Sequence, residues 1–145
     1  IPDVSLTTDI IVGFPGESDS DFKDTMDIVK YVEFDSIYMF QFSPRPGTRA
    51  QDMESSFISK DIIKERFKHL KDVQTDISEK KLKRFVGTKQ TLLIDKQSKK
   101  NDKVLTGKID SGQITHIDNK YVSIGDMVQV KVTDSTPFYL KAELI

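Results

Sequence analysis

Hydrophobic positions along the first 58 residues predict a strand, a helix and a second strand. The run Leu6–Val12 is rich in β-branched residues and ends at Gly13, a pattern typical of a strand buried on both faces in a parallel sheet. A serine–aspartate capping box then opens a stretch with apolar residues at helical spacing, which predicts a helix over about residues 19–32. Residues 36–42 are again strand-like and end where two prolines break regular structure. We expect the rest of this βαβ sheet to precede the chain, because two strands alone rarely make a stable sheet.

The remaining residues change from a helical to a strand pattern. Apolar residues recur at helical spacing from residue 59 to about residue 85, which predicts one long amphipathic helix, or two. Beyond Gly87 the chain forms short β-type segments, two of which alternate strictly between apolar and polar residues. These segments are Gln90–Ile94, Val104–Ile109, Gln113–Ile117, Met127–Thr133 and Tyr139–Leu144. Five such strands in about 60 residues predict a small closed barrel of the OB-like type.

The chain thus divides into three segments, which also differ in charge. Residues 1–58 form the α/β part, with 4 Lys and Arg against 11 Asp and Glu. Residues 59–85 form a helical connector with 9 against 5, and residues 86–145 form the all-β module with 9 against 7. The acidic first segment and the basic remainder indicate a polyanion as the partner of the second half only.

Composition excludes several kinds of site. The chain has no cysteine, so it holds neither disulfides nor thiolate metal sites, and its two histidines, His69 and His116, are isolated. No apolar run approaches the roughly 18 residues that a membrane helix needs. The chain starts at Ile1 without an initiator methionine or the basic region of a signal peptide, which indicates a piece of a longer protein.

The segment after the first strand is the best candidate for a ligand site. It places glycines at the C-terminal end of a parallel strand, where α/β proteins bind their ligands. Gly13 and Gly16 let a ligand approach the backbone, and Glu17 could accept hydrogen bonds from an amine or a hydroxyl. A tight turn with a helix-capping acid explains the same residues, so both interpretations stay open.

Two motifs carry a resemblance to a known family. The strings TDIIVGFPGE at Thr8–Glu17 and SPRPGT at Ser43–Thr48 resemble the last βα units of the radical-SAM methylthiotransferases. The second motif, together with Phe34–Ser36, is most similar to the MiaB-type branch, which acts on tRNA. The similarity continues into a C-terminal TRAM domain around Leu105–Lys108. The implied fold is α/β plus all-β: the end of a partial (βα)6 barrel followed by a five-stranded OB-like TRAM barrel.

The resemblance also implies a chemistry. Enzymes of this family hold two [4Fe–4S] clusters, whose cysteines would all lie outside this chain, and cleave S-adenosyl-L-methionine reductively to a 5′-deoxyadenosyl radical. They install a methylthio group with S-adenosyl-L-methionine as the methyl source. In the MiaB-type branch the acceptor is C2 of N6-isopentenyladenosine, next to the tRNA anticodon. The expected partners are the anticodon stem–loop and an electron donor, the expected location is the cytoplasm, and the chain alone is expected to be inactive.

Site residues follow from the same resemblance. The adenine of S-adenosyl-L-methionine is expected to contact the ends of the two strands, at Ile11, Gly13, Phe14, Phe42 and Ser43. Arg45 would lie near the mouth of the barrel, where a planar cation meets a carboxylate or a phosphate. An ordinary surface cation explains Arg45 equally well, and core packing is the commoner role of a strand aromatic such as Phe42. Neither a catalytic residue nor a metal ligand is expected in the chain.

The all-β module offers a candidate RNA surface. Four lysines crowd one loop and a fifth follows at a strand start, and such a cationic lobe binds phosphates without sequence preference. They are Lys96, Lys99, Lys100, Lys103 and Lys108. Phe138 and Tyr139 are candidates for stacking on bases, although one of them is expected to pack in the barrel. His116 is expected to be structural, and His69 to lie on the helix surface or seam. A solvated lysine-rich hairpin is the alternative.

Other functions stay open at this point. A sibling enzyme would modify threonylcarbamoyl-adenosine in tRNA or an aspartate of a ribosomal protein, and a non-catalytic RNA-binding module would also fit a chain without cysteines. The unpaired barrel edge is further expected to make residues 1–58 self-associate, swap or lose order in isolation, because open apolar strands invite association.

Overall fold

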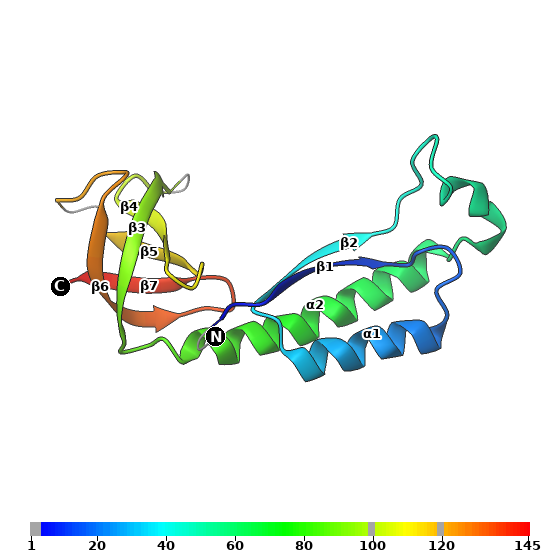
Figure 1. The fold of residues 1–145 in the computed structure, drawn as a ribbon, viewed down its shortest axis with the longest axis horizontal. Coiled ribbons are helices and arrows are strands. Elements are labelled where there is room, and N and C mark those ends of the chain that lie inside the picture. Colours follow the sequence, from blue (N-terminus) through cyan, green and yellow to red (C-terminus); the bar gives the residue numbers. More distant parts are fainter. Residues whose placement is uncertain (1–3, 99–100, 119–120) are drawn as a thin grey trace. The chain divides into compact units, whose positions relative to one another are not determined.

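The computed structural model describes residues 4–98, 101–118 and 121–145 (Figure 1). The chain separates into two compact units. The βα unit comprises Leu6–Ile77, and the barrel unit comprises Ser78–Ile145 together with Val4 and Ser5. Each unit has its own hydrophobic core.

The βα unit contains the predicted strand, helix and strand. They are β1 (Thr7–Val12), α1 (Asp19–Val32) and β2 (Ser36–Gln41). The two strands pair in parallel, with Thr7 opposite Ser36 and Val12 opposite Gln41. A short 3₁₀ helix η1 (Gln51–Ser56), for which the sequence pattern gives no signal, and the long helix α2 (Lys60–Lys83) follow.

Helix α1 starts and stops where its local chemistry dictates. The Ser18 hydroxyl accepts the backbone N–H of Asp21, and the Asp21 carboxylate accepts the backbone N–H of Ser18, so the predicted capping box is complete. This hydrogen bonding to Ser18 lowers the pKa of Asp21. The helix ends at Glu33, which adopts the left-handed conformation with φ of 49° and donates its N–H to the Val29 carbonyl.

The sheet of the βα unit is covered on one face only. Both helices lie on the same face of β1 and β2 (Figure 1), and their apolar side chains form the core with Val12 and Ile37. The opposite face leaves Ile11, Tyr38 and Phe40 at least half exposed. Nothing in the described residues packs against that second face, so within this chain the first strand is buried on one face only.

The connector is a single helix. Helix α2 runs without interruption over the 24 residues Lys60–Lys83, so the pattern that allowed one helix or two corresponds to one. Its buried stripe includes Ile63, Leu70 and Ile77, as the helical spacing predicts. The residues up to Ile77 belong to the βα unit, and the last turns belong to the barrel unit.

The barrel unit is the predicted five-stranded closed barrel. Its strands are β3 (Lys89–Gln97), β4 (Val104–Ile109), β5 (Ile114–Asp118), β6 (Met127–Ser135) and β7 (Leu140–Leu144). They close in the order β3-β4-β5-β7-β6, with β5 and β7 parallel and the other pairs antiparallel. Leu92, Leu140 and Val130 are fully buried inside, and Leu82 from α2 packs against them.

A glycine inside β4 marks where two strands approach most closely. A Cβ at Gly107 would run into the backbone carbonyl of Leu93 on β3. The register between these strands shifts between Ile94 and Lys96, as at a β-bulge. Gly107 is therefore required for close packing rather than for a turn.

The described residues contain neither a membrane-spanning helix nor a cluster of metal-ligating side chains. No helix among them is long and apolar enough to cross a membrane. No group of three or more His, Asp or Glu side chains in residues 4–98, 101–118 and 121–145 is arranged to hold a metal ion.

Candidate cofactor loop and nucleic-acid surface

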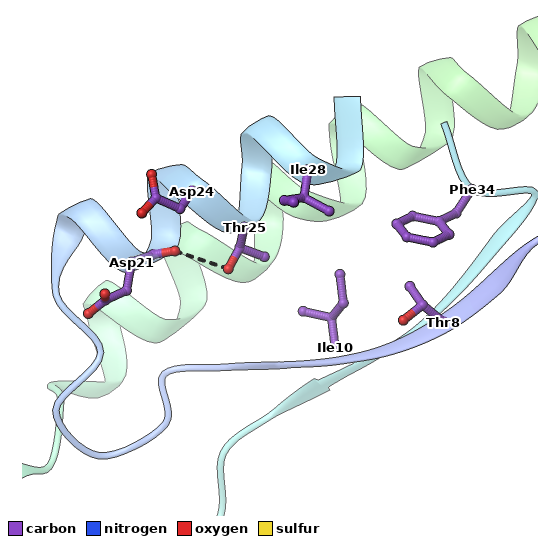
Figure 2. A pocket seen from close by; sticks show the side chains of 7 residues that line it. All are labelled: Thr8, Ile10, Asp21, Asp24, Thr25, Ile28 and Phe34. Atoms are coloured by element: carbon purple, nitrogen blue, oxygen red, sulfur yellow. Dashed lines mark hydrogen bonds between the residues drawn. The ribbon is translucent and has the colours of Figure 1, made fainter. Parts of the chain in front are cut away.

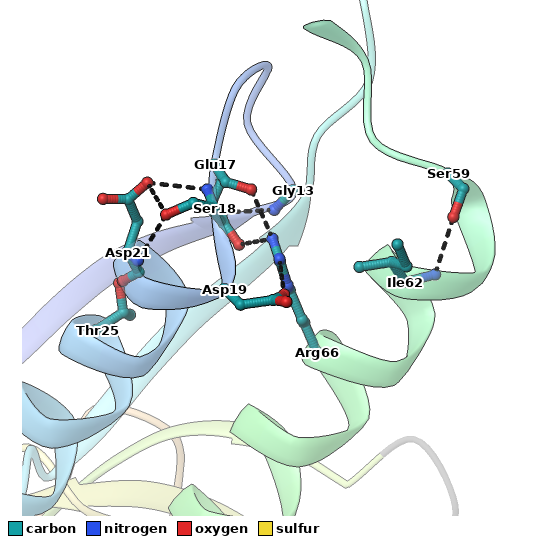
Figure 3. A network of polar contacts seen from close by, with 9 residues as sticks. All are labelled: Gly13, Glu17, Ser18, Asp19, Asp21, Thr25, Ser59, Ile62 and Arg66. Atoms are coloured by element: carbon teal, nitrogen blue, oxygen red, sulfur yellow. Dashed lines mark hydrogen bonds and ion pairs between the residues drawn. The ribbon is translucent and has the colours of Figure 1, made fainter.

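The loop after β1 is held by hydrogen bonds within the βα unit (Figure 3). Gly13, with φ of 78°, donates its N–H to Oε2 of Glu17 over 2.8 Å. The N–H of Glu17 returns to the Phe14 carbonyl, and the N–H of Gly16 reaches the Ser56 carbonyl, both over 2.9 Å. A side chain at residue 13 would collide with Ile63 of α2, so only glycine fits there.

One arginine on α2 clamps this loop to the start of α1. Arg66 is 7% exposed, and its Nη1 donates to the backbone carbonyl of Glu17 and to its Oε1, over 3.0 and 2.7 Å. Its Nη2 donates to Asp19 over 2.6 Å (Figure 3). Burial disfavours the charged guanidinium, but hydrogen bonds to both carboxylates outweigh it, and the pKa of Arg66 is raised.

The Glu17 carboxylate is therefore engaged by the protein itself. One oxygen accepts from Gly13 and the other from Arg66, which supports the interpretation as a tight turn, while the role of ligand acceptor stays a prediction. The sequence did carry a signal for Arg66. It lies three residues after Ile63 and four before Leu70, so a charged residue occupies a position of the buried stripe.

The predicted cofactor residues lie at or beside the open face. Ile11 pairs in register with Phe40, and both side chains are about half exposed there. Phe14 is 44% exposed and contacts Phe42 edge to face, with ring centroids 5.4 Å apart. Phe42 also contacts Phe57, at 5.7 Å.

The backbone around these residues limits what a ligand can use. The N–H of Phe42 donates to the Val12 carbonyl, and that of Gly13 is engaged by Glu17, so neither can donate to an adenine ring. Ser43 and Arg45 lie exposed in the proline-rich loop. Ile11 and Phe14 leave apolar surface exposed, and a chain without cysteine lacks the thiolate ligands of an iron–sulfur cluster.

A hollow of about 400 Å³ lies on the other side of β1, beside α1 (Figure 2). Ile10, Ile28 and Phe34 line its apolar end, and Asp21 and Asp24 line its acidic end. Ile28 is 57% exposed. None of the predicted cofactor residues takes part, so this hollow is an uncovered apolar patch along the strand and is separate from the loop.

The outer face of the barrel carries a row of polar side chains in register. Lys96 on β3 lies opposite Thr106 on β4, Thr106 lies opposite His116 on β5, and His116 lies opposite Lys141 on β7. Thr106 Oγ1 and His116 Nδ1 are hydrogen-bonded over 2.8 Å. The row crosses four strands and ends in a lysine on each side.

The structure describes three of the five predicted RNA-binding lysines. Lys96, Lys103 and Lys108 are exposed, and Lys108 shares the outer face of β4 with Thr106. Lys99 and Lys100 lie outside the described residues. His69 is exposed on α2 and contacts Phe22 edge to face, which agrees with the predicted surface position.

Comparison with known proteins supports this division of the chain. The family model described as the TRAM domain matches residues 83–145, which contain the whole closed barrel. Residues 83–145 therefore form a TRAM domain.

Relatives match the chain over its whole length. Proteins named tRNA-2-methylthio-N(6)-dimethylallyladenosine synthase are 40% identical in Corynebacterium jeikeium and 41% identical in Geobacillus kaustophilus, over 99% and 100% of this chain. The protein of that name in Francisella tularensis subsp. novicida is 37% identical over 99% of the chain. The chain spans 28%, 27% and 32% of the length of these three relatives.

The expected resemblance is confirmed. Over its whole length the chain is similar to the C-terminal portion of the MiaB-type tRNA methylthiotransferases, including their TRAM domain.

Proposed function

We propose that the chain is the cofactor-edge and RNA-holding portion of a cytoplasmic enzyme that adds a methylthio group to C2 of N6-isopentenyladenosine next to the tRNA anticodon. The observation that carries this proposal is the similarity, over the whole chain, to proteins named for that product. S-adenosyl-L-methionine would supply the radical and the methyl group, and two [4Fe–4S] clusters would be ligated by cysteines outside this chain. An electron donor is a further partner.

The βα unit would provide one wall of the cofactor site. Ile11 and Phe14 would lie against the adenine, and Phe42 would support Phe14 from behind through their edge-to-face contact. Gly13 shapes the loop, and Ser43 follows at the end of the second strand. Arg45 would meet a carboxylate or a phosphate at the mouth.

The barrel unit would hold the tRNA. The exposed lysines of the β3–β4 region offer positive charge to the RNA backbone, and they lie within residues 83–145, which match the TRAM domain. The five lysines named for this role are Lys96, Lys99, Lys100, Lys103 and Lys108. Without the parts that hold the clusters, the chain would bind RNA but not react.

Nucleoside analysis tests the proposed reaction. Cells that lack the parent gene should lose a methylthio-adenosine from their tRNA and accumulate the isopentenylated precursor, as seen by mass spectrometry. A plasmid with the intact gene should restore the product. If methylthio-threonylcarbamoyl-adenosine disappears instead, the substrate is that of the sibling enzyme, and an unchanged nucleoside profile would refute a tRNA-modifying role.

Charge reversal tests the RNA-holding surface. Full-length protein with Lys103→Glu and Lys108→Glu should bind the anticodon stem–loop about tenfold more weakly, with a salt dependence reduced by roughly two counterions. The matched control reverses Lys23 and Lys30 on α1, which changes the net charge equally in the acidic unit. Lys99→Glu with Lys100→Glu extends the test to the rest of the loop. If the control weakened RNA binding equally, the barrel lysines would not be part of the RNA interface.

A further inference from the structure

The outer face of the barrel contains a groove that the lysine loop does not explain. It has a volume of about 810 Å³ and is lined by the polar row from Lys96 to Lys141 and by the segment that leads into β7. Ligand pockets commonly fall between about 300 and 1,000 Å³, so this groove is large enough for a nucleotide.

Two aromatic rings border the groove. Phe138 lines it with a side chain that is 67% exposed, although a phenylalanine gains most by burial. Tyr139 is half-buried and contacts the His116 ring edge to face, with centroids 4.5 Å apart. A mobile base could therefore stack on Phe138, while Tyr139 fixes the imidazole beside it.

Within the groove, the His116 side chain can form a hydrogen bond of fixed direction. His116 Nδ1 is bonded to Thr106 Oγ1, and within the described part of the chain the other ring nitrogen, Nε2, has no partner. Burial, with a smaller effect of the Lys96 charge, lowers the pKa of His116, so the ring is neutral at physiological pH. A neutral imidazole can exchange one hydrogen bond with the edge of a base.

The charges around the groove are balanced. Lys96 and Lys141 lie at the two ends of the row, but Asp118 and Glu143 also line it, and Lys141 is paired with Asp134 over 2.7 Å. That pair is exposed and costs little to open. The groove therefore offers a phosphate contact at either end without the strong field of a duplex-binding surface.

We propose that this groove binds one unstacked nucleotide of single-stranded RNA, with its base on Phe138 and its edge against His116, and its phosphate near Lys96 or Lys141. The proposal deepens the RNA-holding role and rests on it. A duplex keeps its bases stacked and cannot place one there, so the groove distinguishes the loop of a stem–loop from its stem.

Fluorescence anisotropy on the 145-residue chain tests the groove. The probes are a labelled anticodon stem–loop and a labelled duplex with the sequence of the stem. Phe138→Ala should weaken stem–loop binding about tenfold and leave duplex binding unchanged, because one stacked base is lost. Phe138→Tyr should retain binding, and Tyr31→Ala, which removes an aromatic side chain 89% exposed on α1, should change neither probe.

The outcomes separate the two proposals. If the wild-type chain binds neither RNA, the RNA-holding role itself fails. If it binds the stem–loop and Phe138→Ala binds it equally well, the groove is not a nucleotide site, whereas the lysine surface stands. Equal weakening of both probes also overturns the groove, since Phe138 would then act on binding in general. Thermal melting of each variant shows whether the barrel is intact.

Discussion

The two units of this chain differ in how completely the strands of their sheets are paired and their apolar faces are covered. Every strand of the barrel unit pairs on both sides, and one closed interior holds its core. In the βα unit, β1 and β2 pair only with each other among the described residues, and helices cover one face. A closed barrel has no free edge, whereas an open parallel pair leaves edges and an apolar face in water.

This difference determines where each unit can bind something. The barrel packs one apolar core inside, and its outer face carries lysines and a histidine beside exposed apolar side chains such as Phe138. The βα unit exposes Ile11, Tyr38 and Phe40 on the face that its helices leave open. One unit therefore offers a polar surface to a polyanion, and the other offers an apolar surface that needs a partner.

Removal of the Arg66 side chain should give the largest difference in stability between the two units. Arg66→Ala leaves the largely buried Glu17 carboxylate without its cation, which should cost about 3 kcal/mol. Hydrogen exchange read by mass spectrometry should show lost protection in β1 and α1 while β3 to β7 stay protected. A uniform loss in both units would show that they unfold as one.

A matched control lies on the same helix. Lys68 forms an exposed pair with Asp72 over 2.7 Å, one turn apart. Lys68→Ala should change stability by less than about 0.5 kcal/mol, because such surface pairs contribute little.

In the barrel unit, a substitution at Gly107 is the counterpart of the Arg66 variant. Gly107→Ala should destabilise the barrel by about 2 kcal/mol, because the new methyl meets the Leu93 carbonyl and the strands must separate. Gly112→Ala, at a turn with φ of 81° and open space around it, should cost only about 1 kcal/mol of backbone strain. Thermal melting checks the order of the two variants, and a milder effect at Gly107 would contradict the close packing.

Local signals predicted most of the secondary structure. The capping box located the start of α1 at Asp19, and the strands of the barrel fell within a few residues of their predicted bounds. Closure of the barrel followed from the number and length of those strands. The helix η1 was missed, because a single turn without a regular apolar pattern gives no periodic signal.

Contacts distant in the sequence were harder to predict. Glu17 and Arg66 are 49 residues apart, and only the fold shows that the glutamate is held by this arginine. The register that aligns Lys96, Thr106 and His116 depends on a bulge in β3, which no local pattern specifies. The choice of cofactor residues rests on resemblance and remains a prediction.

The two units should also differ in their tendency to self-associate. The chain should form dimers or larger species through the βα unit, because β1 has an open edge and Ile11 and Ile28 are exposed on its two sides. Ile11→Lys with Ile28→Lys should shift the mass measured by light scattering toward the monomer. Ile124→Lys, an equally exposed position in the barrel unit, should not. A wild-type monomer with a protected βα unit would refute this prediction.

The smallest expected effect concerns His116. Its pKa is lowered in the folded barrel, chiefly by burial and then by Lys96, whereas an unfolded chain protonates it near its ordinary value of about 6.5. The unfolded state then binds more protons, so barrel stability should fall as the pH drops through about 6.5 and level off below the folded pKa. His116→Gln should weaken this pH dependence, and Lys96→Gln should raise the midpoint of the His116 ring signals in an NMR titration. A wild-type midpoint at or above the ordinary value would mean that the ring is not desolvated by the groove.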